Sequence, residues 1–416
     1  MAIELHSHTI EKLKAVVKQI EFLLLSDFPH TSSEAALCLF KNHFEEQVLR
    51  VEKAHASGDR SVLMQACATA NSRIGLYLPL LGFLLRSTNV RNNFECYDAL
   101  LQIAQQLIGS NANIVISSEW QISPLTYPLT VPVLPGYVLL GMPATESSNA
   151  LILPLAGHEL GHSIWLKDNL EGAWASKVQS NIYDYIVREQ VRFCDAFPVY
   201  RGRQIDGSLL SSDMFITLIV DDISKFTLSQ MEETYCDAIG LKIFGESFAH
   251  AFHYLLAPGL GEQRALHYPT LPARARFMVA YGGLDFGALG YPDYPSEFQE
   301  LTPRLSKEQV FISRAADDIT IGLAGALYAE AAFKVASSAP NLISEKSHQD
   351  EILAMFKRGI PSRQPRSLPD ILNAGWQFVR EGKQTDETDR RPIFEWTSEL
   401  VLKSIEVLEF RRHLHA

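Results

Sequence analysis

Apolar residues recur at helical spacing along most of the chain. In the first 110 residues this spacing predicts four helices, at 10–25, 34–55, 61–85 and 93–108. The last of them ends at Gly109, and glycine is common just beyond a helix C-terminus. We therefore expect an N-terminal helical region.

The pattern changes after residue 110. Short apolar runs at 112–117 and 136–141 predict two strands, and five prolines between positions 124 and 143 indicate extended or looped chain. A polar loop is expected at 202–212, and the apolar run 215–223 is ambiguous between strand and helix. Further helical patterns follow at 167–200, 307–337, 350–358, 371–380 and 395–413. The predicted fold class is predominantly α with a small β-sheet (α+β).

A stretch rich in glycine, proline, aspartate and aromatic residues at 281–300 predicts a loop and a boundary. Together with the change near residue 110, it divides the chain into three expected regions. These are an N-terminal helical region (1–110), a central core (111–295) and a C-terminal helical region (296–416). The flanking helices are candidates for binding a protein partner.

Composition and charge narrow the class of protein. With 416 residues, of which 47% are hydrophobic, the chain can bury a sizeable core. The net charge of -11 and the lack of a long basic run argue against nucleic acid or an anionic membrane as a partner. The most apolar early run, 76–85, is too short to span a bilayer, so no membrane span is expected.

Cysteine usage and the N-terminus predict a cytoplasmic location. The cysteines are odd in number and scattered, without a CxxC pair, which is typical of reduced thiols. The first residues lack the basic start and apolar centre of a signal peptide. The five cysteines are Cys38, Cys67, Cys96, Cys194 and Cys236.

The strongest chemical signal is the HExxH pattern formed by His158, Glu159 and His162. Residues four apart share one face of a helix, so the two imidazoles can bind one Zn²⁺. Glu159 lies beside the first histidine, where a carboxylate can act as general base toward water. The flanking residues are apolar, which predicts a buried helix whose polar groups must be paired or bind metal. The alternative is a solvated helix whose histidines bind nothing.

A second acidic helix can complete such a site, because two histidines leave a catalytic zinc one protein ligand short. Glu233 and Asp237 are four apart and share a face, so one can bind the metal while the other accepts the free N–H of a ligand histidine. Glu232 points about one helical step away and is the weaker candidate. The small Ala238 and Gly240 allow close helix packing. The alternative interpretation is a solvated acidic face.

These two segments, HELGH and EETYCDAIG, resemble the gluzincin zinc metallopeptidases, whose third ligand is a glutamate in an ExxxD pattern. The resemblance implies a zincin-like core with His158, His162 and Glu233 as ligands. It also implies that Glu159 is the base and that Asp237 is the partner of His158.

A third segment, HYPTLPAR, resembles the HPxLxxR segment of the CAAX-prenyl-protease and heat-shock-protease branch of that family. The family histidine aligns with Tyr268, and His267 precedes it, so either side chain is a candidate donor to an oxyanion. Arg274 is expected to position that group or to bind a substrate carboxylate. A plain turn with a surface arginine is the alternative. The membrane helices of that branch are not predicted here, so its substrate class does not carry over.

The sequence therefore predicts a zinc-dependent metallopeptidase whose partner is a peptide or protein substrate. Segment 137–142 is a candidate edge strand for holding a substrate backbone. Two alternatives stay open: a non-catalytic interaction protein with a structural metal site, and a zinc hydrolase that acts on a non-peptide amide. An intact Glu159 favours catalysis, because a purely structural site needs no base.

Overall fold

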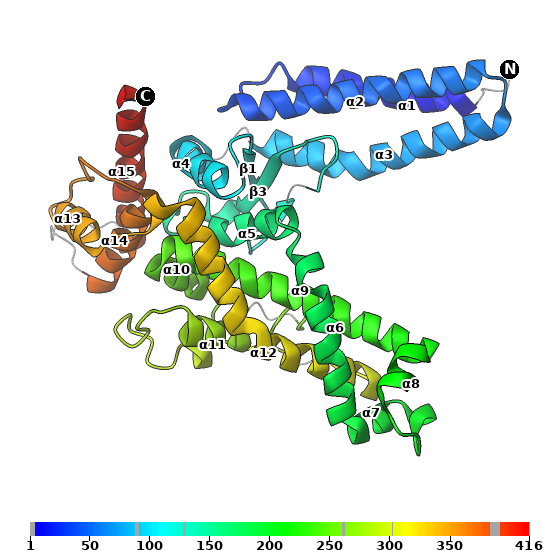
Figure 1. The fold of residues 1–416 in the computed structure, drawn as a ribbon. Helices are drawn as coiled ribbons and strands as arrows, with labels where there is room; N and C mark the ends of the chain where they lie inside the picture. Colours follow the sequence, from blue (N-terminus) through cyan, green and yellow to red (C-terminus); the bar gives the residue numbers. More distant parts are fainter. Residues whose placement is uncertain are drawn as a thin grey trace. The chain divides into compact units, whose positions relative to one another are not determined.

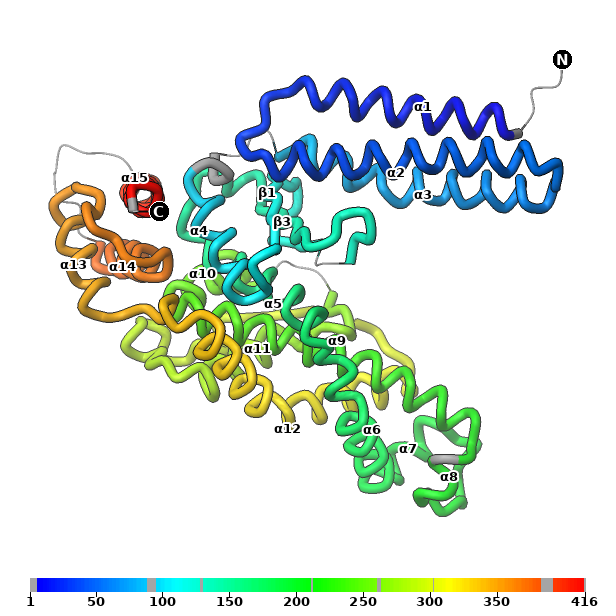
Figure 2. Tube along the Cα trace, turned by 45° about the horizontal axis from the view of Figure 1, so that its top comes forward, coloured from blue at the N-terminus to red at the C-terminus, as the bar shows by residue number. Residues whose placement is uncertain are grey.

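The structure is a computed structural model that describes residues 5–87, 91–127, 130–259, 263–301, 303–382 and 392–415. It is predominantly helical with one small mixed sheet, as the sequence predicts. Contacts divide the chain into two compact units. Unit 1 comprises residues 1–105 and 109–148, and unit 2 comprises 106–108 and 149–416. Figures 1 and 2 show the two units coloured along the chain.

Unit 1 begins with three long helices that run side by side (Figure 1). Short turns connect them, such as the turn at Ser57–Asp59 between the second and the third helix. Asp59 accepts hydrogen bonds from the amides of Ser61 and Val62 and so caps the third helix. The helices are α1 (Leu5–Leu23), α2 (Thr31–Ala56), α3 (Arg60–Arg86) and α4 (Arg91–Leu107), of which the last residues of α4 belong to unit 2.

The sheet of unit 1 has three strands in the order β1-β3-β2. β1 (Asn113–Glu119) runs parallel to β3 (Tyr137–Pro143), with Val115 opposite Leu139, and β2 (Leu125–Tyr127) is antiparallel to β3. Every residue of β3 is buried, which explains why the central strand is a continuous apolar run rather than an alternating one. β2 is too short for its pattern to predict a strand.

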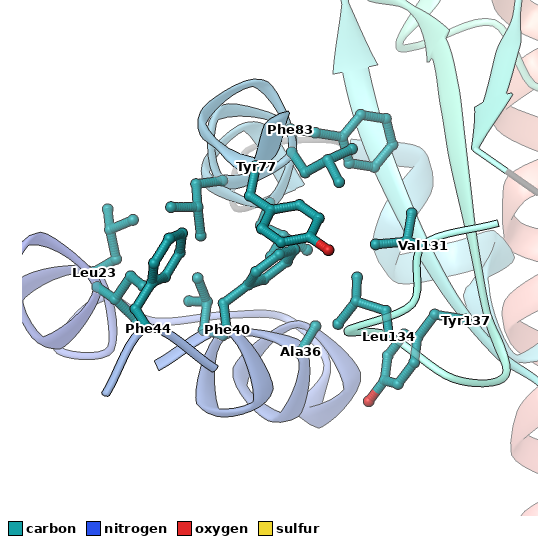
Figure 3. Close-up of a cluster of buried hydrophobic side chains, with 14 of the residues drawn as sticks. Leu23, Ala36, Phe40, Phe44, Tyr77, Phe83, Val131, Leu134 and Tyr137 are labelled. Carbon is teal, nitrogen blue, oxygen red and sulfur yellow. The ribbon is translucent and has the colours of Figure 1, made fainter. Parts of the chain in front are cut away.

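A buried aromatic cluster joins the long helices to the sheet within unit 1 (Figure 3). The Tyr77 ring of α3 meets Phe40 and Phe44 of α2 edge-on, at centroid distances of 5.4 and 6.2 Å. Leu134, just before β3, is fully buried in the same cluster. Burying one such aromatic side chain contributes about 1.5–3 kcal/mol to stability.

Unit 2 is helical among its described residues, and its longest helices are α9 and α12, which pack against each other. The segment 215–223, ambiguous in sequence, is the first part of α9. Part of the expected loop 202–212 is a short helix, α8. The helices are α5 (Ala156–Lys167), α6 (Leu170–Arg188), α7 (Gln190–Ala196), α8 (Gly207–Ser212), α9 (Met214–Phe244), α10 (Glu246–Leu256), α11 (Leu271–Tyr281), α12 (Lys307–Ser338), α13 (Lys346–Phe356), α14 (Leu368–Glu381) and α15 (Ile393–His415).

The two units differ from the three regions expected from sequence, because the C-terminal helices pack into the same unit as the HExxH helix. Trp376 of α14 donates a hydrogen bond of 2.9 Å from its indole to the carbonyl of Leu151. Leu151 lies in the short 3-10 helix (Ala150–Leu155) that leads directly into α5. The 281–300 stretch also lies inside unit 2, where the hydroxyl of Tyr294 donates to the carbonyl of Ala249.

Helix α12 is, by length and composition alone, apolar enough to cross a membrane. Of its most apolar window, 44% is buried inside the protein. The helix packs on α9, and its Asp317 accepts a hydrogen bond from Gln230 of α9 at 2.9 Å. A long core helix meets the same length and composition criteria.

Glycines allow α5 to approach α9 closely. A Cβ atom added at Gly161 would lie 2.7 Å from the Cα of Cys236, and one at Gly157 would lie 3.0 Å from the Cα of Gly240. The distance at Gly161 is shorter than Cβ atoms show in proteins, and the obstructing atom is backbone. At Gly157 the nearest atom belongs to the Phe244 ring, at 2.9 Å. This contact brings the HExxH face of α5 against the acidic segment of α9, as the small residues of α9 predict.

We predict that Gly161→Ala destabilises the protein by about 1–3 kcal/mol, because the new methyl group must push two backbones apart. Urea denaturation would measure the loss. The matched control is Gly322→Ala in α12, where an added Cβ meets no atom within 4 Å. This control should be neutral or stabilising by up to about 1 kcal/mol, since alanine favours a helix. Equal stabilities of the two variants would contradict the close contact.

Candidate metal centre

The two histidines of the HExxH pattern lie on α5 and share one face of it. His158 is 9% exposed and the neighbouring Glu159 is 7% exposed. The imidazole rings of His158 and His162 are 5.1 Å apart between centroids. The chain enters α5 through the buried 3-10 helix, so this end of α5 lies in the interior. The expectation of a buried helix is confirmed.

Glu233 of α9 faces both imidazoles. Its Oε2 lies 3.3 Å from Nε2 of His158, and its Oε1 lies 3.7 Å from Nε2 of His162. One ligand atom from each of the three residues lies within 4.8 Å of the others. A tetrahedral ion with bonds of about 2.0–2.1 Å separates its ligands by about 3.4 Å. The three side chains could therefore hold a metal ion with little movement.

Each of the two histidines is hydrogen-bonded to a carboxylate through its other ring nitrogen. Nδ1 of His158 lies 2.9 Å from Oδ1 of Asp237, and Nδ1 of His162 lies 2.7 Å from Oε1 of Glu232. An ionised carboxylate can only accept, so in the neutral ring Nδ1 carries the proton and donates it. In this tautomer Nε2 has no proton, and its lone pair lies on the side of Glu233. A histidine that binds a metal through Nε2 requires this tautomer.

Glu232 is the residue that sequence reasoning undervalued. Its position one helical step from Glu233 suggests a side chain that points away, yet in the structure it bonds to His162. A signal was present in the sequence. Two ligand histidines need two acceptors, and Asp237 can serve only one of them, so a second acid beside Glu233 was the available partner.

Arg274 of α11 supports the site from behind Asp237. Its Nε and Nη2 donate to the two oxygens of Asp237 at 2.7 and 2.6 Å, and its guanidinium lies 5.0 Å from the centroid of the Phe252 ring. The side chain is buried, which excludes the surface arginine considered from sequence. Its third nitrogen, Nη1, lies 3.8 Å from Oε2 of Glu233, and its expected role toward an oxyanion or a substrate carboxylate stays a prediction.

The electrostatics of the site favour a positive charge at the imidazoles. Burial lowers the pKa of His158, but hydrogen bonds with Asp237 and Glu233 outweigh it and raise the pKa to about 10. Burial opposes ionisation of Asp237, yet the Arg274 guanidinium lowers its pKa to about 2. The pKa of Glu233 is also lowered, since the histidines outweigh its burial. The negative carboxylates that keep these buried imidazoles protonated also favour a metal cation in place of the protons.

Glu159 is free of the network that ties the other acids. Among the described residues, no hydrogen bond or ion pair involves its carboxylate. Burial raises its pKa. A buried, unpaired carboxylate with a raised pKa is a stronger base than one in water. It lies on the same helix turn as the ligand candidates and is available to a bound water.

The charges of the site act on Tyr268. The charge of Glu233 is the main cause that raises the pKa of the Tyr268 phenol, followed by burial. The His267 ring is tilted by 51° to the Tyr268 ring, with 4.5 Å between the centroids, and both side chains are exposed. The sequence left Tyr268 and His267 open as oxyanion donors. Of these two, Tyr268 is the residue whose pKa is shifted by the charge of Glu233.

The Tyr268 segment is fixed by a clamp from Arg264. The guanidinium of Arg264 donates to the carbonyl of Tyr268 at 3.1 and 3.0 Å and forms an ion pair with Asp317 of α12. Gln230 of α9 bonds to both Asp317 and the carbonyl of Leu266. These bonds tie the loop that carries Tyr268 to α9 and α12.

Other predicted features lie apart from the metal-ligand candidates. His250 bonds to the Tyr291 hydroxyl at 2.9 Å and stacks on Trp376. Burial lowers its pKa to about 3, so it is neutral. The expectation that 137–142 is an edge strand is wrong, because this segment is β3, the central strand of its sheet, which is paired with β1 on one side and with β2 on the other. The five cysteines are free thiols.

Comparisons with protein-family models, with curated proteins and with solved structures find no match for this chain. The assignment of the site therefore depends on its own geometry.

We predict that Glu232→Ala weakens metal binding about 10–100-fold, because His162 loses the acceptor that fixes its orientation and tautomer. Competition with a chromophoric chelator would measure the affinity. Asp222→Ala, an exposed acid ten residues earlier on α9, is the matched control and should bind metal as the wild type does. An unchanged affinity in Glu232→Ala would contradict the orienting role.

Proposed function

We propose that this chain is a zinc-dependent metallopeptidase. The observation that carries the proposal is the joint placement of His158, His162 and Glu233, each within 4.8 Å of the others, beside the unpaired carboxylate of Glu159. The likeness of HELGH, EETYCDAIG and HYPTLPAR to gluzincin motifs supports it.

The donor set favours zinc over the hard cations. Imidazole nitrogens suit zinc and other late transition metals, whereas calcium and magnesium select oxygen ligands. Two histidines and one carboxylate form the set used by catalytic zinc sites, which leave a further position open. When bound, zinc supplies Lewis-acid polarisation of a carbonyl and lowers the pKa of a water.

Glu159 performs the proton transfers in this proposal. Its raised pKa suits a base that takes a proton from the attacking water as oxygen adds to the carbonyl carbon. The protonated Glu159 then gives that proton to the amine nitrogen as the carbon–nitrogen bond breaks. Water is consumed and an acid and an amine are formed, so the carboxylate is restored at the end of each turnover.

Tyr268 stabilises the charge that develops on the carbonyl oxygen. Its phenol keeps its proton at neutral pH, because the Glu233 charge and burial raise its pKa, so it can donate a hydrogen bond. The clamp formed by Arg264 holds the backbone of Tyr268 before substrate arrives. A donor that needs no rearrangement costs little free energy in the transition state.

The geometry disfavours one of the two alternatives and does not separate the other from a peptidase. A structural zinc site is closed by four protein ligands, whereas the described group here offers three. A buried base beside the ligands has no use in a structural site. A zinc hydrolase of a non-peptide amide would use the same residues, so only substrates can separate it from a peptidase.

We predict that Glu159→Gln lowers peptide hydrolysis about 10²–10⁴-fold while metal content is unchanged, since the amide cannot take a proton. The assay is turnover of a mixed peptide library by zinc-loaded protein, followed by mass spectrometry. A parallel panel of small non-peptide amides tests the second alternative. Wild-type protein that holds zinc yet cleaves no member of either panel would contradict the catalytic proposal and favour a structural metal.

A further inference from the structure

A cavity lies at the C-terminal end of α13 in unit 2. Its volume is about 470 Å³, within the range of small-molecule sites. It shares no lining residue with the metal centre. The walls come from α13 and from the segment that follows it, which the sequence marks as basic and proline-containing.

Three arginines line this cavity without an anionic partner. Arg358, Arg363 and Arg366 are exposed at its walls, and within the described part of the chain their guanidinium groups form no ion pair or hydrogen bond. The neighbouring lysines differ. Lys346 pairs with Asp350 at 3.4 Å, and Lys357 pairs with Glu381 at 2.6 Å. The local carboxylates therefore neutralise the lysines and leave the arginines available.

The segment that carries the arginines is held rigidly. Gly359, with φ of 69°, turns the chain back after α13, and the amide of Ile360 bonds to the carbonyl of Met355 at 3.1 Å. The amide of Ser362 donates to the hydroxyl of Ser404 on α15 at 2.9 Å. Arg411 of α15 donates to the carbonyl of Arg363 at 3.0 Å. A fixed backbone lowers the entropy lost when the arginines bind a ligand.

The lining combines positive charge with an apolar wall. Glu351 is the carboxylate among the lining residues, so the three guanidinium groups and this carboxylate together carry a net charge of +2. Ile352 and Met355 supply aliphatic surface. This concentration of positive charge stands out on a chain whose net charge is -11. Like charges that are gathered in one cavity repel each other unless an anion lies between them.

We propose that this cavity binds a small polyanion that carries at least two negative charges on phosphate or carboxylate oxygens. Two charges match the net charge of the lining. Planar guanidinium groups bind such oxygens in pairs of hydrogen bonds, which favours arginine over lysine at the site. The aliphatic wall leaves room for a carbon framework between or beside the charged groups.

Calorimetric titration of the full-length protein with pyrophosphate, and separately with citrate, tests the proposal. We expect saturable binding of at least one probe with a dissociation constant below about 1 mM at ~0.05 M salt, and weaker binding as salt is raised. Binding of pyrophosphate alone identifies phosphate chemistry, and binding of citrate alone identifies carboxylate chemistry. Absence of binding by both probes would overturn the proposal.

The variant Arg358→Gln/Arg363→Gln/Arg366→Gln should weaken binding at least about tenfold, since each charge-assisted bond lost is worth roughly tenfold in affinity. The matched control, Arg276→Gln/Arg304→Gln/Arg314→Gln, removes the same charge from exposed positions elsewhere in unit 2 and should bind as the wild type does. Circular dichroism checks that both variants fold. Equal affinities of the two variants would overturn the site. Prior chelation of metal should leave binding unchanged, so this result is independent of the peptidase proposal.

Discussion

The close contact of α5 with α9 is the constraint on which the rest of the site depends. Gly157 and Gly161 remove the side chains that would separate the two backbones, so the histidine face of one helix meets the acidic segment of the other. A Cβ atom at either position would lie 3.0 Å or less from an atom of α9, so the two helices could not approach as closely as they do. The metal-ligand geometry follows from this packing of small residues.

A series of contacts between charged side chains then gives each residue of the site one role. Arg274 holds Asp237 ionised, Asp237 orients His158, and Glu232 orients His162. Breaking one of these contacts leaves a buried charge without its partner, which costs about 3–5 kcal/mol. Glu159 takes no part in this series of charge contacts and remains basic. The protein thus separates the acids that position ligands from the acid that is available to move a proton.

Much of this could be read from the sequence, and the exceptions have physical causes. Helical periodicity placed most helices, including α12, and the HExxH spacing placed His158 and His162, because local spacing alone decides which residues share a helix face. The start of α9 was left ambiguous, because its apolar run 215–223 fits a strand as well as a helix. The partners of Arg274 and Glu232 could not be predicted, because they depend on how α9, α11 and α5 cross. The joining of the C-terminal helices to the site depends on Trp376 reaching Leu151, a contact between residues far apart in the chain.

The central claim is that His158, His162 and Glu233 together hold a metal ion. Elemental analysis of the purified protein beside Glu233→Ala tests it most directly. The account predicts close to one equivalent of zinc in the wild type and a large loss in Glu233→Ala, with both proteins folded. Wild-type protein that retains no metal after reconstitution with zinc, or a Glu233→Ala variant that retains the full amount, would contradict the three-ligand centre.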